Sequence, residues 1–104
     1  DDSVQAALAA YEAFLKVRPG SIVIKNNLAW LYLESGRYNK AVEVSKEAHE
    51  LMPTGGAVAD TYGWALYKKG DIAEAISVLR LAVKLLPNDK IQAHLDEALS
   101  TEKN

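Results

Sequence analysis

The chain has no cysteine and very few prolines, methionines or phenylalanines. Its 104 residues include no Cys, three Pro, one Met and one Phe. Without cysteine, neither a disulfide framework nor a thiolate metal site can form. This absence is compatible with a reducing and with an oxidising compartment, so the sequence leaves the localisation open.

An excess of basic charge is missing as well. The 12 Lys and Arg residues stand against 14 Asp and Glu, which gives a formal net charge of -2. The sequence shows no basic stripe with interleaved aromatic residues, which is the pattern typical of binding to a nucleic-acid backbone. We therefore expect no nucleic-acid partner.

Long apolar runs are also absent. The longest ones span only a few residues, whereas about 20 are needed to cross a bilayer, so we expect no direct membrane insertion. The acidic start DDSVQAAL lacks the basic and then apolar order of a signal peptide. Because the chain begins with Asp rather than Met, we expect it to be part of a longer protein, from which a targeting segment could have been removed.

The composition that remains is typical of a soluble folded protein. Hydrophobic residues make up 49% of the chain and charged residues 25%. A chain of 104 residues is expected to form one domain. A domain of this size buries only about two-thirds of the surface that its unfolded chain exposes. Every apolar face must therefore find a neighbouring element.

A repeat of 34 residues organises the chain. Pro19, Pro53 and Pro87 are spaced at this interval, and so are the two tryptophans, Trp30 and Trp64. A fixed period of about 20 to 50 residues is the signature of a repeat architecture. The same interval separates further identical residues: Gly36 and Gly70, Ala41 and Ala75, Ala48 and Ala82, and Leu51 and Leu85.

The apolar residues within each repeat recur at the spacing of two helices. A first helix is predicted over residues 22–34, and its copy lies one period later. A second helix is predicted over residues 38–51 and again over 72–85. Each second helix follows Gly36 or Gly70, and glycine suits the positive-φ position that ends a helix. The proline that closes each repeat cannot continue a helix, so it separates one helical pair from the next.

The two ends of the chain continue this pattern. Residues 3–17 precede Pro19 as the other second helices precede their prolines, which predicts a second helix without its first helix. Residues 89–101 keep one apolar stripe beside polar residues, which predicts a capping helix with one solvated face. We expect four segments: a half-repeat at 1–20, full repeats at 21–54 and 55–88, and a cap at 89–104.

A 34-residue unit with these marks resembles the tetratricopeptide repeat (TPR) family. The resemblance implies an all-α fold, a right-handed α-solenoid of antiparallel helix pairs with about six helices in this chain. In one departure from the family pattern, Lys25 and Ala59 stand where a Trp is usual near the start of the first helix. The matching residues are Leu28, Ala29, Tyr32, Gly36, Tyr38, Ala41, Ala48 and Pro53 in one unit, and Gly63, Gly70, Ala75, Ala82 and Pro87 in the next.

Two features of the sequence refine this resemblance. The stretches NNLAWLY and DTYGWALY, with His94 and Leu95 in the cap, look like repeats of bacterial envelope and exopolysaccharide-associated TPR lipoproteins of the PEP-CTERM system. Such a protein would be bacterial, with the cytoplasm and the periplasm both open. Family members that hold a C-terminal carboxylate use basic and Asn residues on their first helices. Only Asn27 matches here, and Glu34 and Asp60 would repel an anion, so we expect no such carboxylate clamp.

Small residues mark where the two helices of a unit approach each other. We expect Ala29 and Gly63 on the first helices to face Ala41 and Ala75 on the second helices. A larger side chain would overpack such a contact and cost about 1–3 kcal/mol.

The resemblance places a binding surface on the first helices, which line a concave groove in this family. Aromatic rings on their outward side would form its floor, and amides and charges would supply polar handles for an extended or helical peptide. The alternative is that both tryptophans fill the seam between neighbouring first helices. The predicted groove residues are Asn26, Asn27, Trp30, Leu33, Glu34, Asp60, Trp64, Tyr67, Lys68 and His94.

Nothing in the sequence indicates an enzyme, a metal site or a cofactor. His49 and His94 are the only histidines, and neither has a second His three or four residues away to make a metal pair. We interpret His49 as a half-exposed residue of a second helix. For His94 we favour a hydrogen bond back to the previous first helix, with Asp60 as its partner, over a contact with a ligand.

The sequence therefore predicts a non-catalytic scaffold that binds a peptide or a segment of a protein partner in the groove. The alternative is self-association. The helix at 3–17 carries Ala6, Leu8, Ala10 and Phe14 with no helix before it, and a second copy or upstream repeats could cover that face.

Overall fold

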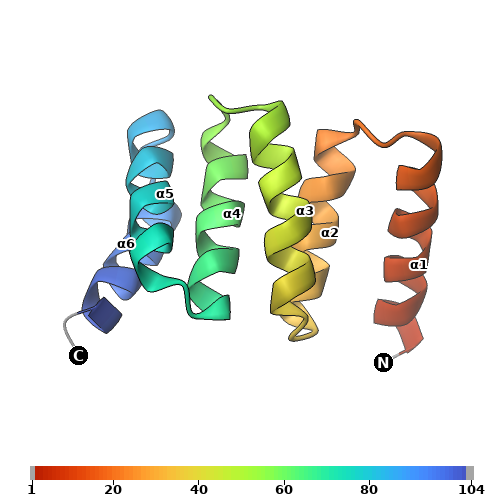
Figure 1. Ribbon diagram of the computed structural model, residues 1–104, viewed down its shortest axis with the longest axis horizontal. Helices are drawn as coiled ribbons and strands as arrows, with labels where there is room; N and C mark the ends of the chain where they lie inside the picture. Colours follow the sequence, from red (N-terminus) through yellow and green to blue (C-terminus); the bar gives the residue numbers. More distant parts are fainter. Residues whose placement is uncertain (1, 103–104) are drawn as a thin grey trace.

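The computed structural model describes residues 2–102, which form six α-helices joined by short loops (Figure 1). The first and last predicted segments extend to residues 1 and 103–104, which lie outside the described residues. The helices are α1 (Asp2–Val17), α2 (Ile22–Glu34), α3 (Tyr38–Leu51), α4 (Gly56–Lys69), α5 (Ile72–Leu85) and α6 (Asp89–Glu102).

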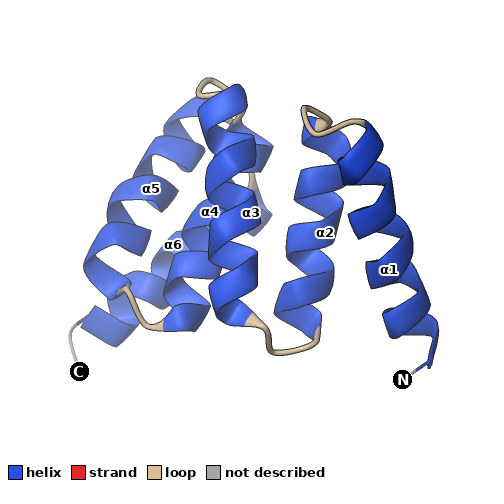
Figure 2. Ribbon diagram, turned by 45° about the vertical axis from the view of Figure 1, so that its right-hand side comes forward, coloured by secondary structure: helices blue, strands red, loops and turns tan. Residues whose placement is uncertain are grey.

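The helices stand antiparallel in two rows (Figures 1 and 2). The first helices α2, α4 and α6 contact one another in turn, whereas the second helices α1, α3 and α5 do not. Because the first helices lie closer together, the array is concave on their side. We call this side the inner surface and the side formed by α1, α3 and α5 the outer surface. The predicted all-α solenoid of six helices is confirmed.

Glycines end two of the helices, and polar side chains cap the beginnings of two others. Gly36 and Gly70 have φ angles of 76° and 105°, in the left-handed region that favours glycine, as predicted. Ser21 begins α2 by accepting a hydrogen bond from the backbone N–H of Ile24. Asn88 does the same for α6 by accepting from the N–H of Ile91 at 2.9 Å.

Small residues lie at the helix crossings, with one difference from the expected pairing. Ala29 and Ala41 are fully buried in the same core cluster. Gly63, however, faces Leu79 rather than Ala75: a Cβ placed on Gly63 would lie 2.7 Å from Leu79 Cγ and 3.2 Å from its backbone nitrogen. Ala75 packs instead in a cluster with Tyr62 and Leu66. The crossing of α4 and α5 is therefore centred about one turn further along α5.

The helix α1 packs against α2 and leaves its other side open. Leu8 is buried in the core with residues of α2 and α3, so its predicted place on the uncovered face is wrong. Leu8 lies on the same face of α1 as Tyr11 and Leu15, three and seven residues later, and all three pack against this core. Ala6, Ala10 and Phe14 are exposed, as that prediction required.

Two buried tyrosines hold carboxylates of neighbouring helices. The Tyr32 hydroxyl donates to Glu12 of α1, and the Tyr62 hydroxyl donates to Glu74 of α5 at 3.2 Å. Burial, and then the adjacent carboxylate, raises the pKa of each tyrosine to about 12, because both disfavour the phenolate. Both rings therefore stay neutral hydrogen-bond donors over the ordinary pH range.

The crossing at Gly63 predicts the effect of one added methyl group. The substitution Gly63→Ala is expected to lower the free energy of unfolding by about 1–2 kcal/mol. Overpacking costs about 1–3 kcal/mol, and the 2.7 Å approach to Leu79 puts this site in the upper part of that range, about 2–3 kcal/mol. The better helix propensity of alanine offsets about 1 kcal/mol of that cost. Leu79 cannot move away freely because it is fully buried.

Chemical denaturation measures this difference, with Gly20→Ala as the control because a Cβ on Gly20 would meet nothing within 4 Å. A Gly63→Ala protein as stable as the parent would show that α4 and α5 are not in this close contact.

Candidate functional site

A row of aromatic rings connects the three first helices on the inner surface. The ring of Trp64 on α4 stacks on His94 of α6, with centroids 4.1 Å apart and planes inclined by 19°. The Tyr67 ring, also on α4, stacks on Trp64 as well, with centroids 4.9 Å apart. Trp30 on α2 lies 6.2 Å from His94, at a tilt of 35°. We call Trp30, Trp64, Tyr67 and His94 the aromatic row.

A buried hydroxyl fixes the position of Trp30. The indole Nε1 of Trp30 donates to Oγ1 of Thr61 at 3.0 Å, which joins α2 to α4. Thr61 is almost fully buried, and its hydroxyl in turn donates to the carbonyl of Ala57 one turn earlier. A buried indole N–H needs such an acceptor, so Thr61 sets the orientation of the ring.

A second polar contact joins α4 to α6. Nδ1 of His94 lies 2.7 Å from Oδ1 of Asp60, as the sequence predicts. The side chains of His94 and Asp60 are only 14% and 5% exposed, so water screens this contact little. The bond holds the imidazole in the plane that stacks on Trp64. A carboxylate buried to this degree needs a hydrogen-bonding partner, and His94 supplies one.

These contacts answer whether the tryptophans lie in the seam or in the groove. Trp30 and Trp64 each reach from one first helix to the next, which places both in the seam between repeats. Both remain partly exposed on the inner surface. Each ring therefore contributes to the packing of the solenoid and also presents part of its surface to solvent.

Two lysines lie over the tryptophans of the aromatic row. Nζ of Lys68 is 5.8 Å from the centroid of Trp64, and Nζ of Lys90 is 4.9 Å from that of Trp30. Both distances are within the range of a cation–π contact. Both lysine residues are exposed, so their charges are open to a partner.

The other predicted groove residues divide into three groups. Asn27 and Glu34 are exposed on α2, outside the aromatic row. Leu33 is only 8% exposed and belongs to the core cluster that contains Ala65, so its predicted place on the groove surface is wrong. It points into the seam because α2 packs directly against α4. Asp60 is not a free polar handle either, because His94 occupies it.

A hollow of about 200 Å³ adjoins the row beside Trp30. Asn26 borders it, and its Oδ1 is buried with no hydrogen-bond donor within the described chain. Further lining residues include Thr61, Asn88, Lys90 and Ile91. The hollow thus combines an apolar wall with groups that can hydrogen-bond to a partner's backbone.

Sequence reasoning missed Thr61 and Lys90. Trp30 and Thr61 are 31 residues apart. This separation is three residues short of one 34-residue period, and three residues are about one helical turn. A search for polar residues at that offset from each Trp would have found Thr61. Lys90 lies at the beginning of α6 and gives no comparable signal.

The described residues offer no group of three or more His, Cys, Asp or Glu side chains that could hold a metal ion. His49 lies away from the aromatic row, half-buried on α3, where its ring stacks on Tyr62 at 5.6 Å. Within residues 2–102, the helices are too short or too polar to cross a membrane.

Comparison with known protein families agrees with this geometry. One model described as tetratricopeptide repeat matches residues 33–99, and a second with the same description matches residues 2–53. The chain belongs to the tetratricopeptide repeat family. A TPR repeat-containing protein of Pseudomonas aeruginosa is 40% identical over 61 residues, which are 59% of this chain and 10% of that protein. The narrower resemblance to envelope lipoproteins of the PEP-CTERM system stays a prediction.

Solved TPR structures have the same fold. The Sgt2 TPR domain from Aspergillus fumigatus superposes with a TM-score of 0.90 at 20% identity, over 98% of this chain and 70% of that one. The first TPR of Spaghetti (RPAP3), bound to the HSP90 peptide SRMEEVD, gives a TM-score of 0.90 at 17% identity, over 99% of this chain and 82% of that one. At such identities the likeness shows the fold alone.

The contact between Asp60 and His94 predicts a large coupling energy in a double-mutant cycle. The variants are Asp60→Ala, His94→Ala and the double substitution, and the free energy of unfolding is measured by chemical denaturation. We expect a coupling of about 1–3 kcal/mol, because either single change strands a buried partner.

A matched control is the pair Lys69 and Asp71, whose charged atoms are 3.6 Å apart and whose side chains are 40% and 47% exposed. Its coupling should be at most about 0.5 kcal/mol. Equal couplings in the two cycles would mean that the buried contact does not hold α6 to α4.

Proposed function

We propose that this chain is a non-catalytic scaffold that binds a peptide or an extended segment of a protein partner along its inner surface. The observation that carries the proposal is the aromatic row, in which four rings from three helices lie side by side and stay partly accessible. Aromatic side chains give large contact area at a low cost in conformational entropy, so they dominate binding energy at protein interfaces.

Polar groups beside the row support the same function. Asn26 has a buried acceptor without a donor, and a peptide N–H could supply one. Lys68 and Lys90 add exposed positive charge beside Trp64 and Trp30. A peptide that crosses the first helices would meet these groups in turn. The proposed units 21–54 and 55–88 would each contribute one tryptophan to its binding.

A structural neighbour also supports a peptide ligand. The first TPR of Spaghetti (RPAP3) has this fold and was determined with an HSP90 peptide bound. The chain spans about a tenth of its Pseudomonas relative, so any scaffold role would be that of one segment in a longer protein.

Self-association is the second candidate function, and one observation favours it. Phe14 is 45% exposed on α1, at the position where Ala48 and Ala82 are fully buried in the complete repeats. If two copies pair through this face, light scattering of the chain should give the mass of a dimer, and Phe14→Glu should give that of a monomer. A parent chain that stays monomeric at high concentration would exclude this function for the segment.

Peptide binding is tested with sequences selected from a random display library on the parent chain. For a selected peptide, Trp64→Ala should weaken binding at least about tenfold, because a central aromatic contact is worth about 2 kcal/mol or more and tenfold corresponds to about 1.4 kcal/mol. Lys68→Ala should weaken it about threefold to tenfold and leaves the packing of the row intact.

The matched control is Lys46→Ala, since Lys46 is an exposed lysine of α3 on the outer surface. Circular dichroism confirms that each variant is folded. A folded Trp64→Ala protein that binds the peptide as tightly as the parent would contradict the proposal.

A further inference from the structure

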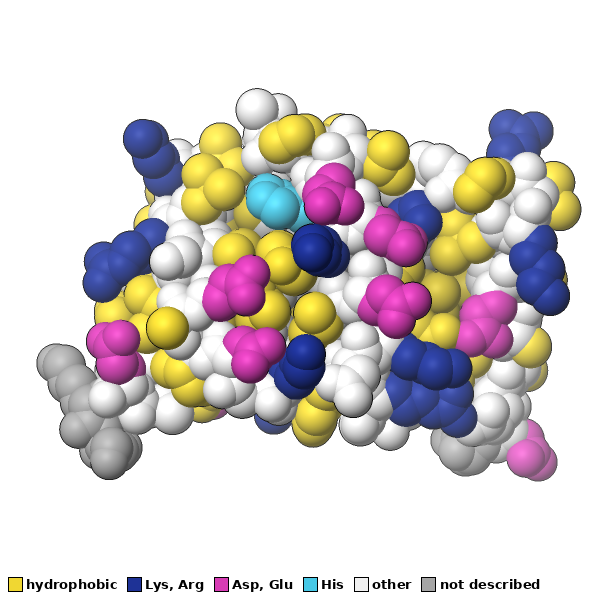
Figure 3. Space-filling view, in the orientation of Figure 1, with side chains coloured by type: hydrophobic (Ala, Val, Ile, Leu, Met, Phe, Trp, Pro, Cys, Tyr) yellow, Lys and Arg dark blue, Asp and Glu magenta, His cyan; other side chains and the backbone are white. Residues whose placement is uncertain are grey.

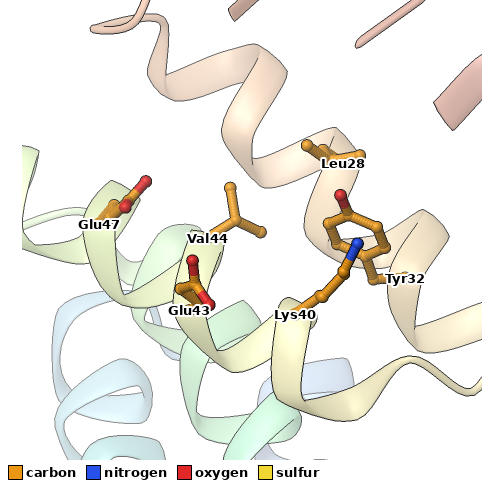
Figure 4. Close-up of a pocket in the computed structure, with 6 residues that line it drawn as sticks. All are labelled: Leu28, Tyr32, Lys40, Glu43, Val44 and Glu47. Atoms are coloured by element: carbon orange, nitrogen blue, oxygen red, sulfur yellow. The ribbon is translucent and has the colours of Figure 1, made fainter. Parts of the chain in front are cut away.

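The outer surface carries a hollow that the aromatic row does not involve. It has a volume of about 240 Å³ and lies between α2 and α3 (Figure 4). We call it the outer pocket. Its lining residues are Leu28, Tyr32, Lys40, Glu43, Val44 and Glu47.

The two repeats differ at this place although they agree in most of their packing. In the second repeat, the position of Leu28 is taken by Tyr62. The Tyr62 ring stacks on His49 of α3 and its hydroxyl donates to Glu74 of α5, so it bridges two second helices. In the first repeat the tyrosine lies one turn later, because Tyr32 stands where the second repeat has Leu66. The hollow of about 240 Å³ between Leu28 and this displaced ring has room for one large side chain.

Acidic groups border the pocket. The carboxylate of Glu43 makes no hydrogen bond or ion pair with any described residue. Glu47 shares its charge with Lys25, whose Nζ is 2.7 Å away. Glu12 of α1 accepts the hydrogen bond of Tyr32 nearby. These positions of α3 are different in the second repeat, where Ser77 and Leu81 replace Glu43 and Glu47. Figure 3 shows acidic side chains on both sides of an apolar floor between α1 and α3.

The floor of the pocket suits an aliphatic stem that ends in a positive charge. Leu28 and Val44 supply apolar contact, and Tyr32 supplies the face of a ring. The chain's own Lys40 already places its Nζ 5.7 Å from the centre of that ring. A cation beside Tyr32 is therefore compatible with the site. Glu12, Glu43 and Glu47 are balanced by Lys25, Lys40 and Arg37, which also acts on Tyr32, and Glu43 is the carboxylate among them without a side-chain partner.

We propose that the outer pocket binds an arginine or lysine side chain of a partner, at a site separate from the inner surface. The stem would lie on Leu28 and Val44, as long basic side chains do on apolar surfaces. The charged end would reach Glu43, whose carboxylate has no other partner in the described chain. A negatively charged ligand in the same place would instead be repelled by the unpaired carboxylate of Glu43.

The test is a titration of the chain with four small probes, followed by the backbone amide signals in NMR. The probes are the N-acetyl amides of arginine, lysine, citrulline and tyrosine. Citrulline has the shape of arginine without its charge. The expected result is that arginine or lysine shifts the signals of Leu28, Tyr32 and Val44 in a saturable way, whereas citrulline does not. The larger of the two responses identifies which basic side chain is preferred.

Two variants make the result specific to the pocket. Glu43→Gln should weaken the binding of the cationic probe about threefold to tenfold, and Lys40→Ala should strengthen it by removing the internal competitor. Glu50→Gln is the matched control, since Glu50 is an exposed glutamate of the same helix outside this pocket.

Three results would overturn the proposal. The first is that neither the arginine nor the lysine probe gives a saturable shift. The second is that the citrulline probe shifts the signals as much as the cationic probes do, or that the tyrosine probe shifts them more. The third is that Glu43→Gln binds the cationic probe as tightly as the parent. None of them bears on peptide binding by the inner surface, because the two sites share no residue.

Discussion

The contact between successive first helices is the interaction on which the rest of this structure depends. No hairpin of the chain can cover its own apolar side, so α4 and α5 must pack between α2 and α3 on one side and α6 on the other. Ile76 and Leu79, for example, are buried with Leu95 and Ala98 of the cap. Because first helices touch and second helices do not, the same contact also curves the array and creates its inner surface.

The seam between first helices contains both the packing and the candidate site. Thr61 orients one tryptophan, and the pair of Asp60 and His94 orients the stack on the other. Fixed rings are an advantage for binding, because little conformational freedom remains to be lost when a ligand arrives. The repeats therefore offer a preorganised surface, which suits the proposed binding of an extended partner.

Much of this arrangement follows from the 34-residue period, and the remainder depends on the rotation of each helix. The spacing of Pro19 and its copies, with glycines at the turns, predicts every helix to within a few residues. It also predicts the contact of His94 with Asp60, which are one period apart. A period does not give the rotation of a helix about its own axis. For this reason the sequence alone wrongly predicts Leu33 on the groove surface and Gly63 opposite Ala75. The outer pocket escaped prediction because it arises from a difference between repeats, Leu28 against Tyr62.

Amide hydrogen exchange of the full chain and of a chain that ends at residue 88 tests most directly whether each hairpin depends on its neighbours. Loss of α6 uncovers Trp64, Ile76 and Leu79 and leaves Asp60 without His94. The account predicts that the amides of α4 and α5 lose most of their protection, while those of α2 and α3 lose less. Unchanged protection of α4 and α5 in the shortened chain would contradict it.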